Sequence, residues 1–252
     1  MNKKINENLI WPLDNLETYP FSKIFKIRDH QIRFAWQIID FVFLLLHKNI
    51  NKKSISSKAE ISPSAIIKGN VVIKAGVKIM EHAKVIGPSF IGKNVIIGNG
   101  SLIRESFISD NCVIGYLIDV ARSYVGNSCW LTKTHVADSF LDDEVNIGGG
   151  TVLASLRLDN KYVNFQIKKR KISTNKIKLG AIIGKKTQIG ANVTVLPGVK
   201  IGKNCIIGAG VVVPNDIKDN LYCKVKHELI FRKNEIIYNG NIRHALRKKL
   251  NG

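Results

Sequence analysis

Aliphatic side chains recur at every sixth position along two long stretches of the chain. An amphipathic helix would repeat every 3.6 residues and a half-buried strand every two, so this period fits neither element. A hexapeptide period, often with a glycine directly after the aliphatic residue, is typical of a parallel β-helix in which three short strands and their turns complete a triangular coil. The aliphatic positions are Ile61, Ile67, Ile73, Ile79, Val85, Ile91, Ile97 and Ile103, then Ile183, Ile189, Val195, Ile201, Ile207 and Val213. The sequence therefore predicts an all-β fold, a left-handed parallel β-helix with stacked Ile and Val side chains as its core.

The hexapeptide register is interrupted between the two stretches. It slips between Ile103 and Ile108, becomes irregular over residues 116–138, and breaks over residues 156–179. An insertion in a solenoid must leave the coil and run over the surface. The last break is rich in basic residues, namely Lys161, Lys168, Lys169, Arg170, Lys171, Lys176 and Lys178. It is interpreted either as one wall of a binding site or as a solvated surface loop.

Two caps flank the predicted solenoid, which spans residues 58–216. Residues 1–57 form an N-terminal helical cap whose helix runs from about residue 28 to 47, and a cap of this kind covers the open end of a solenoid. Residues 217–252 are predicted to form a strand pair at 229–231 and 236–238, followed by a basic helix at 242–250. The apolar stripe of the N-terminal helix consists of Ile32, Ala35, Trp36, Ile39, Phe43 and Leu46.

The chain is strongly basic. It has 252 residues with 39 Lys and Arg against 19 Asp and Glu, a net charge of +20, and 45% hydrophobic residues, enough for a real core. The surplus is interpreted as compositional drift or as binding of small anionic substrates. Nucleic-acid binding is not predicted, because the sequence has no arginine-rich helix, zinc-finger spacing or aromatic RNA-binding motif.

Cysteine spacing and the length of the apolar segments indicate the compartment in which the protein is expected. The four cysteines lie far apart with no C-x-x-C pair, which argues against a metal site or a disulfide scaffold. The N-terminus has no readable signal peptide. The most apolar stretch, residues 34–46, is too short and too polar to span a bilayer. The sequence therefore predicts a cytoplasmic protein with no membrane span and no metal.

Three longer strings narrow the family. Residues 116–126 (YLIDVARSYVG), 145–159 (VNIGGGTVLASLRLD) and 178–184 (KLGAIIG) resemble the left-handed β-helix domain of sugar-1-phosphate nucleotidylyltransferases and the related glucosamine-1-phosphate N-acetyltransferases. The resemblance covers about residues 60–216. No glycine-rich nucleotide loop of the nucleotidylyltransferase domain occurs in residues 1–57. The resemblance implies a homotrimer that transfers acetyl from acetyl-CoA to the amine of a hexosamine 1-phosphate.

The resemblance also implies site residues. His135, in the string His-Val-Ala-Asp-Ser, is the candidate catalytic base, although in alignment it falls on the family's tyrosine and the family's histidine falls on Thr132. Ser155 stands where the family usually has an asparagine that contacts the sugar. The candidate substrate-binding residues are Arg104, Arg122, Ser155 and Lys178, and the candidate acetyl-CoA-binding residues are Ala191, Gly208, Lys224 and Lys226.

Two functions follow from these residues. The first is an acetyl-CoA-dependent acyltransferase in which His135 replaces the usual base. The second is a catalytically silent trimer that serves as an oligomerisation or sugar-nucleotide-binding module for a separate nucleotidylyltransferase. The long matched strings favour a site that binds a ligand, whereas Thr132 at the position of the family's histidine favours the silent module.

Overall fold

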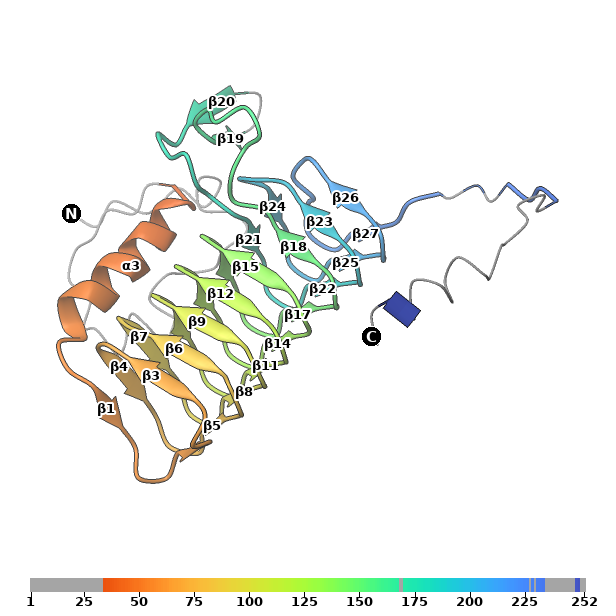
Figure 1. The fold of residues 1–252 in the computed structure, drawn as a ribbon. Coiled ribbons are helices and arrows are strands. Elements are labelled where there is room, and N and C mark those ends of the chain that lie inside the picture. The colour runs from red at the N-terminus through yellow and green to blue at the C-terminus, as the bar shows by residue number, and fades with distance from the viewer. Residues whose placement is uncertain (1–33, 168–169, 227, 229, 234–247, 250–252) are drawn as a thin grey trace, which may run out of the picture.

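The computed structural model describes residues 34–167, 170–226, 228, 230–233 and 248–249. Three parallel sheets run the length of a left-handed β-helix, as the six-residue period predicts (Figure 1). Each strand pairs in parallel with the strand of the same sheet one coil further on, as Ile79 does with Ile97. Every inward-facing aliphatic residue therefore stacks on its counterpart in the next coil, and each such side chain stabilises the fold by about 1.5–3 kcal/mol.

The strands are short and the three sheets share one pattern. Sheet A contains β1 (Ser54–Ile55), β4 (Val71–Ile73), β7 (Ser89–Ile91), β10 (Phe107–Ile108), β13 (Tyr124–Val125), β16 (Phe140–Leu141), β21 (Ile182–Ile183) and β24 (Lys200–Ile201). Sheet B contains β2 (Glu60–Ile61), β5 (Lys78–Ile79), β8 (Ile96–Ile97), β11 (Val113–Ile114), β14 (Trp130–Leu131), β17 (Asn146–Ile147), β22 (Gln188–Ile189), β25 (Ile206–Ile207) and β27 (Tyr222–Cys223). Sheet C contains β3 (Ile66–Lys68), β6 (Lys84–Ile86), β9 (Leu102–Arg104), β12 (Asp119–Ala121), β15 (His135–Ala137), β18 (Val152–Leu153), β23 (Thr194–Val195) and β26 (Val212–Val213).

The irregular hexapeptide register over residues 116–138 does not interrupt the coil. This segment contains β12, β13, β14 and β15, all paired in register with the neighbouring coils. The spacing departs from six because some turns are one residue shorter, as between Val120 and Val125 and between Leu131 and Val136. The coil itself is unbroken, so side chains from these residues still fall on defined faces of the solenoid.

The shortened corners between sheets C and A share a buried serine ladder. The backbone N–H of Ser123 donates to the hydroxyl of Ser106, and the backbone N–H of Ser139 donates to the hydroxyl of Ser123. Each hydroxyl in turn donates to a carbonyl oxygen two residues earlier, as Ser123 does to Ala121. The ladder satisfies the buried backbone groups that a tight turn would otherwise leave unpaired.

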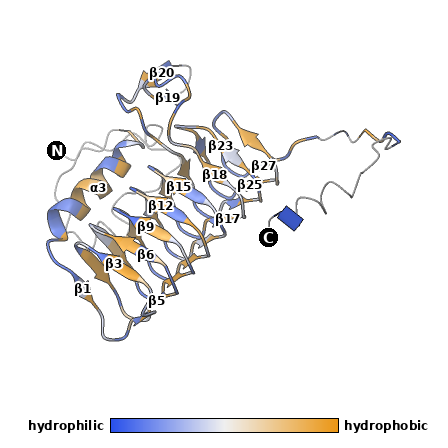
Figure 2. Cartoon of the chain, viewed as in Figure 1, coloured by the Kyte–Doolittle hydropathy of each residue, from blue (hydrophilic) through white to orange (hydrophobic). Residues whose placement is uncertain are grey.

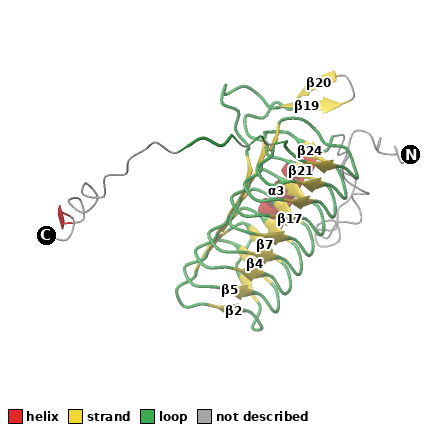
Figure 3. Cartoon of the chain, turned by 90° about the vertical axis from the view of Figure 1, so that its right-hand side faces the viewer, coloured by secondary structure: helices red, strands yellow, loops and turns green. Residues whose placement is uncertain are grey.

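The break after β18 is an arm, which we define as residues 156–179. The chain leaves the solenoid after β18, forms the antiparallel hairpin β19 (Asn164–Ile167) and β20 (Arg170–Ser173), and returns at β21. Figures 1 and 3 both show this hairpin standing out from the coils. Phe165 is fully buried at the base of the arm, with its ring edge-on to Trp36 at 4.8 Å. The arm is therefore packed on the body of the molecule.

One helix, α3 (Gln37–Asn49), covers the outer face of sheet A. Ile38, Ile39, Phe41, Val42, Leu45 and Leu46 are buried, whereas Asp40, Leu44 and Lys48 are exposed, and Figure 2 shows hydrophobic and hydrophilic residues alternating along the helix. The helix was predicted to cap the open end of the solenoid, but it lies along the side. The reason is an apolar row on sheet A, in which Phe90, Phe107, Tyr124 and Phe140 stack at centroid distances of 4.5, 5.5 and 4.4 Å.

A buried lysine continues this row at the C-terminal end of sheet A. Lys200 follows Ile182 in register, and its ammonium group lies 4.0 Å from the centre of the Phe165 ring. The same nitrogen donates to the carbonyl oxygen of Gln166 at 2.8 Å and pairs with Asp216 at 2.5 Å. Lys200 thus connects β24, the arm and the turn after β26.

The remaining predicted elements fall mainly outside the described residues. These are the start of the N-terminal helix and most of the C-terminal strand pair and basic helix. The domain boundaries predicted from the sequence stay predictions. Within the part of the chain that the structure describes, every helix is too short or too polar to cross a membrane.

Candidate functional site

Two polar side chains meet on the open outer face of sheet C. Asp119 and His135 are the first residues of β12 and β15, and they face each other in register. The imidazole Nδ1 lies 3.3 Å from a carboxylate oxygen of Asp119. The His135 side chain is 41% exposed, so a ligand in solution can reach the imidazole. A histidine held by a carboxylate is a common arrangement for a general base.

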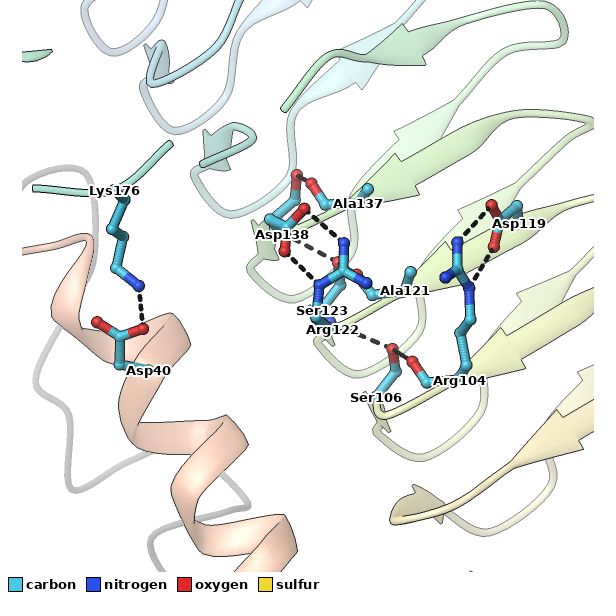
Figure 4. A network of polar contacts seen from close by, with 11 residues as sticks. Asp40, Arg104, Ser106, Asp119, Ala121, Arg122, Ser123, Ala137, Asp138 and Lys176 are labelled. Carbon is cyan, nitrogen blue, oxygen red and sulfur yellow. Dashed lines mark hydrogen bonds and ion pairs between the residues drawn. The ribbon is translucent and has the colours of Figure 1, made fainter. Parts of the chain in front are cut away.

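Arg104 holds the other side of Asp119. Its Nε and Nη2 atoms donate to the two carboxylate oxygens at 3.4 and 3.2 Å (Figure 4). Asp119 therefore bridges Arg104 and His135 across three neighbouring strands of sheet C. The guanidinium predicted to contact substrate is engaged mainly with this carboxylate, and its role in substrate binding stays a prediction.

Arg122 lies at a different edge of sheet C. It occupies the corner between β12 and β13, with φ at +46°, and forms two bonds of 2.6 and 2.8 Å to the carboxylate of Asp138 (Figure 4). This side-chain hydrogen bond to Asp138 raises the pKa of Arg122 above its usual value, despite burial. His135 begins its strand at the opposite edge, so the structure does not bring Arg122 and His135 together.

Ser155 and Lys178 lie at the two ends of the arm. The carbonyl oxygen of Ser155 accepts the N–H of Leu179 at 2.9 Å, and Leu156 bridges to Lys178 in antiparallel fashion. The two predicted substrate contacts are therefore neighbours through the backbone. The side chain of Lys178 is exposed.

Three of the four predicted acetyl-CoA contacts share one edge, the corner between sheets B and C. The carbonyl of Ala191 accepts the N–H of Gly210 at 2.9 Å, which places Ala191 one coil before the Gly208 corner. The N–H of Gly208 donates to Cys223 at 2.7 Å, directly before Lys224. A side chain at Gly208 would lie 3.5 Å from the Cβ of Lys224. Lys226 is exposed and follows this edge.

The same edge continues back toward His135. A Cβ at Gly148 would lie 2.7 Å from the backbone nitrogen of Ala191, so only glycine fits there. A side chain at Gly149 would lie 3.8 Å from the methyl group of Thr132, three residues before His135. Gly148, Gly149, Ala191 and Gly208 therefore follow one another along this edge, which ends at Lys224.

Asp119 is a candidate site residue that sequence reasoning missed. It lies in the string that carries the resemblance, yet it was given no role. The sequence feature that could have identified Asp119 is its distance from His135. Asp119 stands 16 residues before His135, and one coil with two shortened turns contains 16 residues. Counting coils instead of strict hexapeptides would have placed the two side chains next to each other.

An open pocket of about 480 Å³ lies elsewhere, on the arm. Its lining residues are Asn160, Lys161, Tyr162, Asn164, Ser173 and Ile177. No predicted site residue lines this pocket. The contacting polar side chains described above, Arg104, Asp119 and His135, lie instead on sheet C. Among the described residues, no group of three or more His, Cys, Asp or Glu side chains is placed to hold a metal ion.

Two family models match consecutive parts of the chain. Residues 49–173 match the model of the GMPPB C-terminal domain, and residues 180–215 match the bacterial transferase hexapeptide repeat. Among solved structures, the UDP-N-acetylglucosamine acyltransferase LpxA from Bacteroides fragilis is 23% identical, with a TM-score of 0.45 over 66% of this chain and 70% of that one.

Two curated relatives match parts of the chain. A bifunctional sugar-1-phosphate nucleotidylyltransferase/acetyltransferase of Sulfurisphaera tokodaii is 41% identical over 92 residues, or 36% of this chain and 23% of the relative. The bifunctional protein GlmU of Methanocaldococcus jannaschii is 34% identical over 100 residues, or 40% of this chain and 24% of the relative. The aligned regions thus span about a quarter of these relatives. This chain carries a hexapeptide-repeat β-helix domain related to those of the sugar-1-phosphate nucleotidylyltransferase/acetyltransferases.

Proposed function

We propose that this protein is an acyltransferase that moves acetyl from acetyl-CoA to the amine of an amino sugar phosphate similar to glucosamine 1-phosphate. The observation that carries the proposal is the pairing of His135 with Asp119 on the open face of sheet C, at 3.3 Å. The relatives named as acetyltransferases support the same class of reaction.

His135 is the proposed general base. The Asp119 carboxylate beside Nδ1 favours the tautomer that carries its proton there, so the lone pair of Nε2 is available. Nε2 takes a proton from the attacking amine, the C–N bond forms, and the C–S bond of acetyl-CoA breaks. The departing thiolate then takes the proton. Arg104 is a positioning residue, because it holds the carboxylate that orients the imidazole.

The edge between sheets B and C is the proposed acetyl-CoA site. Ala191 and Gly208 would contact the pantetheine chain, and the exposed side chains of Lys224 and Lys226 would contact the phosphates. A lysine is a compact cation with a flexible stem and suits a phosphate. On the acceptor side, Arg122, Ser155 and Lys178 stay candidate contacts for the sugar phosphate.

We further propose that three copies associate through sheets B and C. The outer face of sheet A is covered by α3, whereas exposed apolar side chains such as Trp130 on sheet B and Val152 on sheet C remain on the other two faces. A separate nucleotidylyltransferase is a proposed partner, because the curated relatives that match this chain combine both activities in their names.

The alternative function is a catalytically silent module that binds a sugar nucleotide or holds an oligomer together. One observation favours it. Thr132 occupies the position where the resemblance calls for a histidine, and its hydroxyl is no base near neutral pH. The alternative keeps the ligand-binding edge and removes the chemical step.

The two functions differ in one experiment. Acetyl-CoA is titrated calorimetrically into the full chain at near-physiological salt, which screens non-specific attraction to the net charge. Release of CoA thiol is then followed with glucosamine 1-phosphate as acceptor. The acyltransferase predicts saturable binding and a thiol release that His135→Gln reduces by about 100-fold or more. His82→Gln, an exposed histidine at an earlier corner, is the matched control.

The other outcomes decide either against the enzyme or against His135 as its base. Acetyl-CoA binding with no thiol release supports the silent module. No acetyl-CoA binding removes the acyltransferase proposal altogether. Equal losses in His135→Gln and His82→Gln would mean that His135 has no specific role as a base.

A further inference from the structure

Several apolar side chains of the arm face solvent. Leu158 is fully exposed, and Leu156, Tyr162 and Ile177 are each about half exposed. Leu156 bridges to Lys178, the residue after Ile177. Ile177 and Tyr162 line the same open pocket. Leu156, Tyr162 and Ile177 therefore adjoin one another, with Leu158 two residues beyond Leu156, and we call these four residues the arm patch.

Exposed basic side chains share the arm with this patch. Residues 156–179 contain eight Lys and Arg against a single Asp. That aspartate, Asp159, pairs with Arg157 at 2.5 Å, and Lys176 pairs with Asp40 of α3. Four further basic residues are exposed and have no carboxylate partner among the described residues, namely Lys161, Arg170, Lys171 and Lys178. The arm therefore presents apolar side chains together with positive charge that no nearby carboxylate neutralises.

Other side chains of the arm anchor it to the body of the molecule. Val163, Phe165 and Leu179 are buried in the cluster that also contains the apolar side of α3. Lys176 contacts Asp40 of that helix, as Figure 4 shows. The hairpin nevertheless projects beyond the coils (Figures 1 and 3). The arm is thus held at its base, while the arm patch and the exposed basic residues remain accessible to a partner.

We propose that the arm docks this protein on an anionic lipid surface. At such a surface, apolar side chains are buried at the boundary of the acyl chains while lysine and arginine contact the lipid phosphates. Leu156, Leu158 and Ile177 provide the apolar contact, and tyrosine, present at Tyr162, is enriched at membrane–water interfaces. Lys161, which lines the pocket beside Tyr162, contacts a headgroup phosphate. Docking on a membrane goes beyond the proposed acyl transfer and does not depend on it.

The exposed aliphatic side chains favour a membrane over a nucleic acid as the partner. A nucleic acid is bound through its phosphates and through stacking of its bases on aromatic rings. Leu156, Leu158 and Ile177 provide neither contact and would stay in water in such a complex. An anionic membrane presents phosphates at its surface and hydrocarbon directly beneath, so it matches both the basic and the apolar residues of the arm. Both are needed, because one weak anchor gives only marginal attachment and stable attachment takes two.

The test is sedimentation of the full chain with lipid vesicles at near-physiological salt. We expect binding to phosphatidylcholine vesicles that contain about one third phosphatidylglycerol, and little binding to phosphatidylcholine alone. Leu158→Gln should reduce the partition coefficient by about 5-fold or more, and it should leave the fold intact because the side chain is fully exposed. Leu44→Gln, at an exposed leucine on α3, is the matched control.

The contribution of charge is tested with two double variants of equal net charge. Lys161→Gln combined with Lys171→Gln should reduce the partition coefficient by about 10-fold or more. The matched control is Lys58→Gln combined with Lys93→Gln, at two exposed lysines on the coils, and it removes the same charge. Since salt screens charges that lie far from the membrane, the control should change the partition coefficient by less than about 3-fold.

Other results overturn the proposal. It fails if the protein does not bind anionic vesicles, if Leu158→Gln binds as well as the parent protein, or if both lysine pairs cause the same loss, which would reduce the attraction to net charge. It also fails if a single-stranded oligonucleotide binds, vesicles do not, and Lys161→Gln with Lys171→Gln abolishes that binding, which would assign the arm to a nucleic acid. Acetyl transfer is followed separately by thiol release, so failure of either proposal leaves the other intact.

A fluorescent label at position 158 distinguishes a membrane from a second copy of the chain. Cys112, Cys129 and Cys205 are buried, so in a Cys223→Ser background an environment-sensitive dye reacts with the thiol introduced by Leu158→Cys. We expect the emission to shift to the blue when anionic vesicles are added and to stay unchanged when the protein concentration alone is raised. A blue shift that follows protein concentration without vesicles would mean that a second copy covers the arm patch, and it would overturn the proposal.

Discussion

The outward positions of sheet A carry aromatic rings buried under α3, whereas those of sheet C carry Arg104, Asp119 and His135 open to solvent. Within the described residues, both sheets consist of eight parallel strands of two or three residues, each paired with the strand one coil further on. What differs is only the side chain that each coil places outward. The same β-helix core therefore supports both faces. Sheet A packs against α3, whereas sheet C leaves polar side chains exposed that could contact a ligand.

The largest difference between the two faces should be in stability. Phe107 is fully buried between the rings of Phe90 and Tyr124, so Phe107→Ala leaves a cavity beneath α3 and should reduce the free energy of unfolding by about 3–5 kcal/mol. On sheet C, Lys84 occupies an outward and exposed position, and Lys84→Ala should cost less than about 1 kcal/mol. Denaturant unfolding of both variants measures the two values. Equal losses would mean that α3 adds little to the stability of the solenoid.

The second prediction concerns the lysine at the end of the aromatic row. Lys200→Met removes the ammonium between Phe165 and Asp216 and should reduce the free energy of unfolding by about 2–4 kcal/mol. This is somewhat below the loss for a fully buried pair, because Asp216 keeps partial contact with water. The matched control is Lys185→Met, whose lysine pairs with Asp143 on the surface and should cost less than about 1 kcal/mol.

The same residue should make stability depend on pH. Burial lowers the pKa of Lys200 below its ordinary value of 10.5, so the folded protein releases this proton at a lower pH than the unfolded chain. Stability rises with pH wherever the unfolded state binds more protons. The stability of the parent protein relative to Lys200→Met should therefore rise as the pH approaches 10.5 from below. A difference that stays flat or falls over this range would contradict a lowered pKa.

A smaller loss is expected at the corner where sheets C and A meet. Ser123→Ala removes the hydroxyl that accepts the N–H of Ser139 and donates to Ala121, leaving buried backbone groups without their partner. The expected cost is about 1–3 kcal/mol, and it should appear in the denaturant midpoint. Ser57→Ala, at an exposed position, is the control. A negligible effect of Ser123→Ala would mean that the corner relaxes and regains its hydrogen bonds.

The sequence was sufficient to predict the β-helix but not to predict where α3 packs on it. Inward Ile and Val positions follow from the period alone, because the same side chain must stack on itself in every coil. The row of Phe90, Phe107, Tyr124 and Phe140 also repeats, at spacings of 17, 17 and 16 residues, and these spacings are visible only when the shortened turns are allowed for. The position of α3 followed from this row and not from the helix's own sequence.

The candidate site was partly predictable for the same reason. His135 and Arg104 were identified from motif resemblance, but motif resemblance is linear and does not say that Asp119 lies between them. Arg122 and Lys178 were grouped with them by sequence and lie at other edges of the solenoid. Which edge a residue occupies depends on the exact number of residues in each turn, and a single deletion moves every following side chain.

The smallest expected effect on stability is at Asp119, and it sharpens the comparison most. Asp119→Asn keeps the shape of the side chain and removes its charge at a partly exposed position, so the free energy of unfolding should change by less than about 0.5 kcal/mol. Acetyl transfer should nevertheless fall by about 10-fold or more, because the imidazole of His135 loses the carboxylate that orients it. Parallel measurement of unfolding and thiol release tests both parts. A large loss of stability would mean that Asp119 has a structural role, as the aromatic residues of sheet A do. Unchanged acetyl transfer would mean that Asp119 does not assist His135 in the reaction.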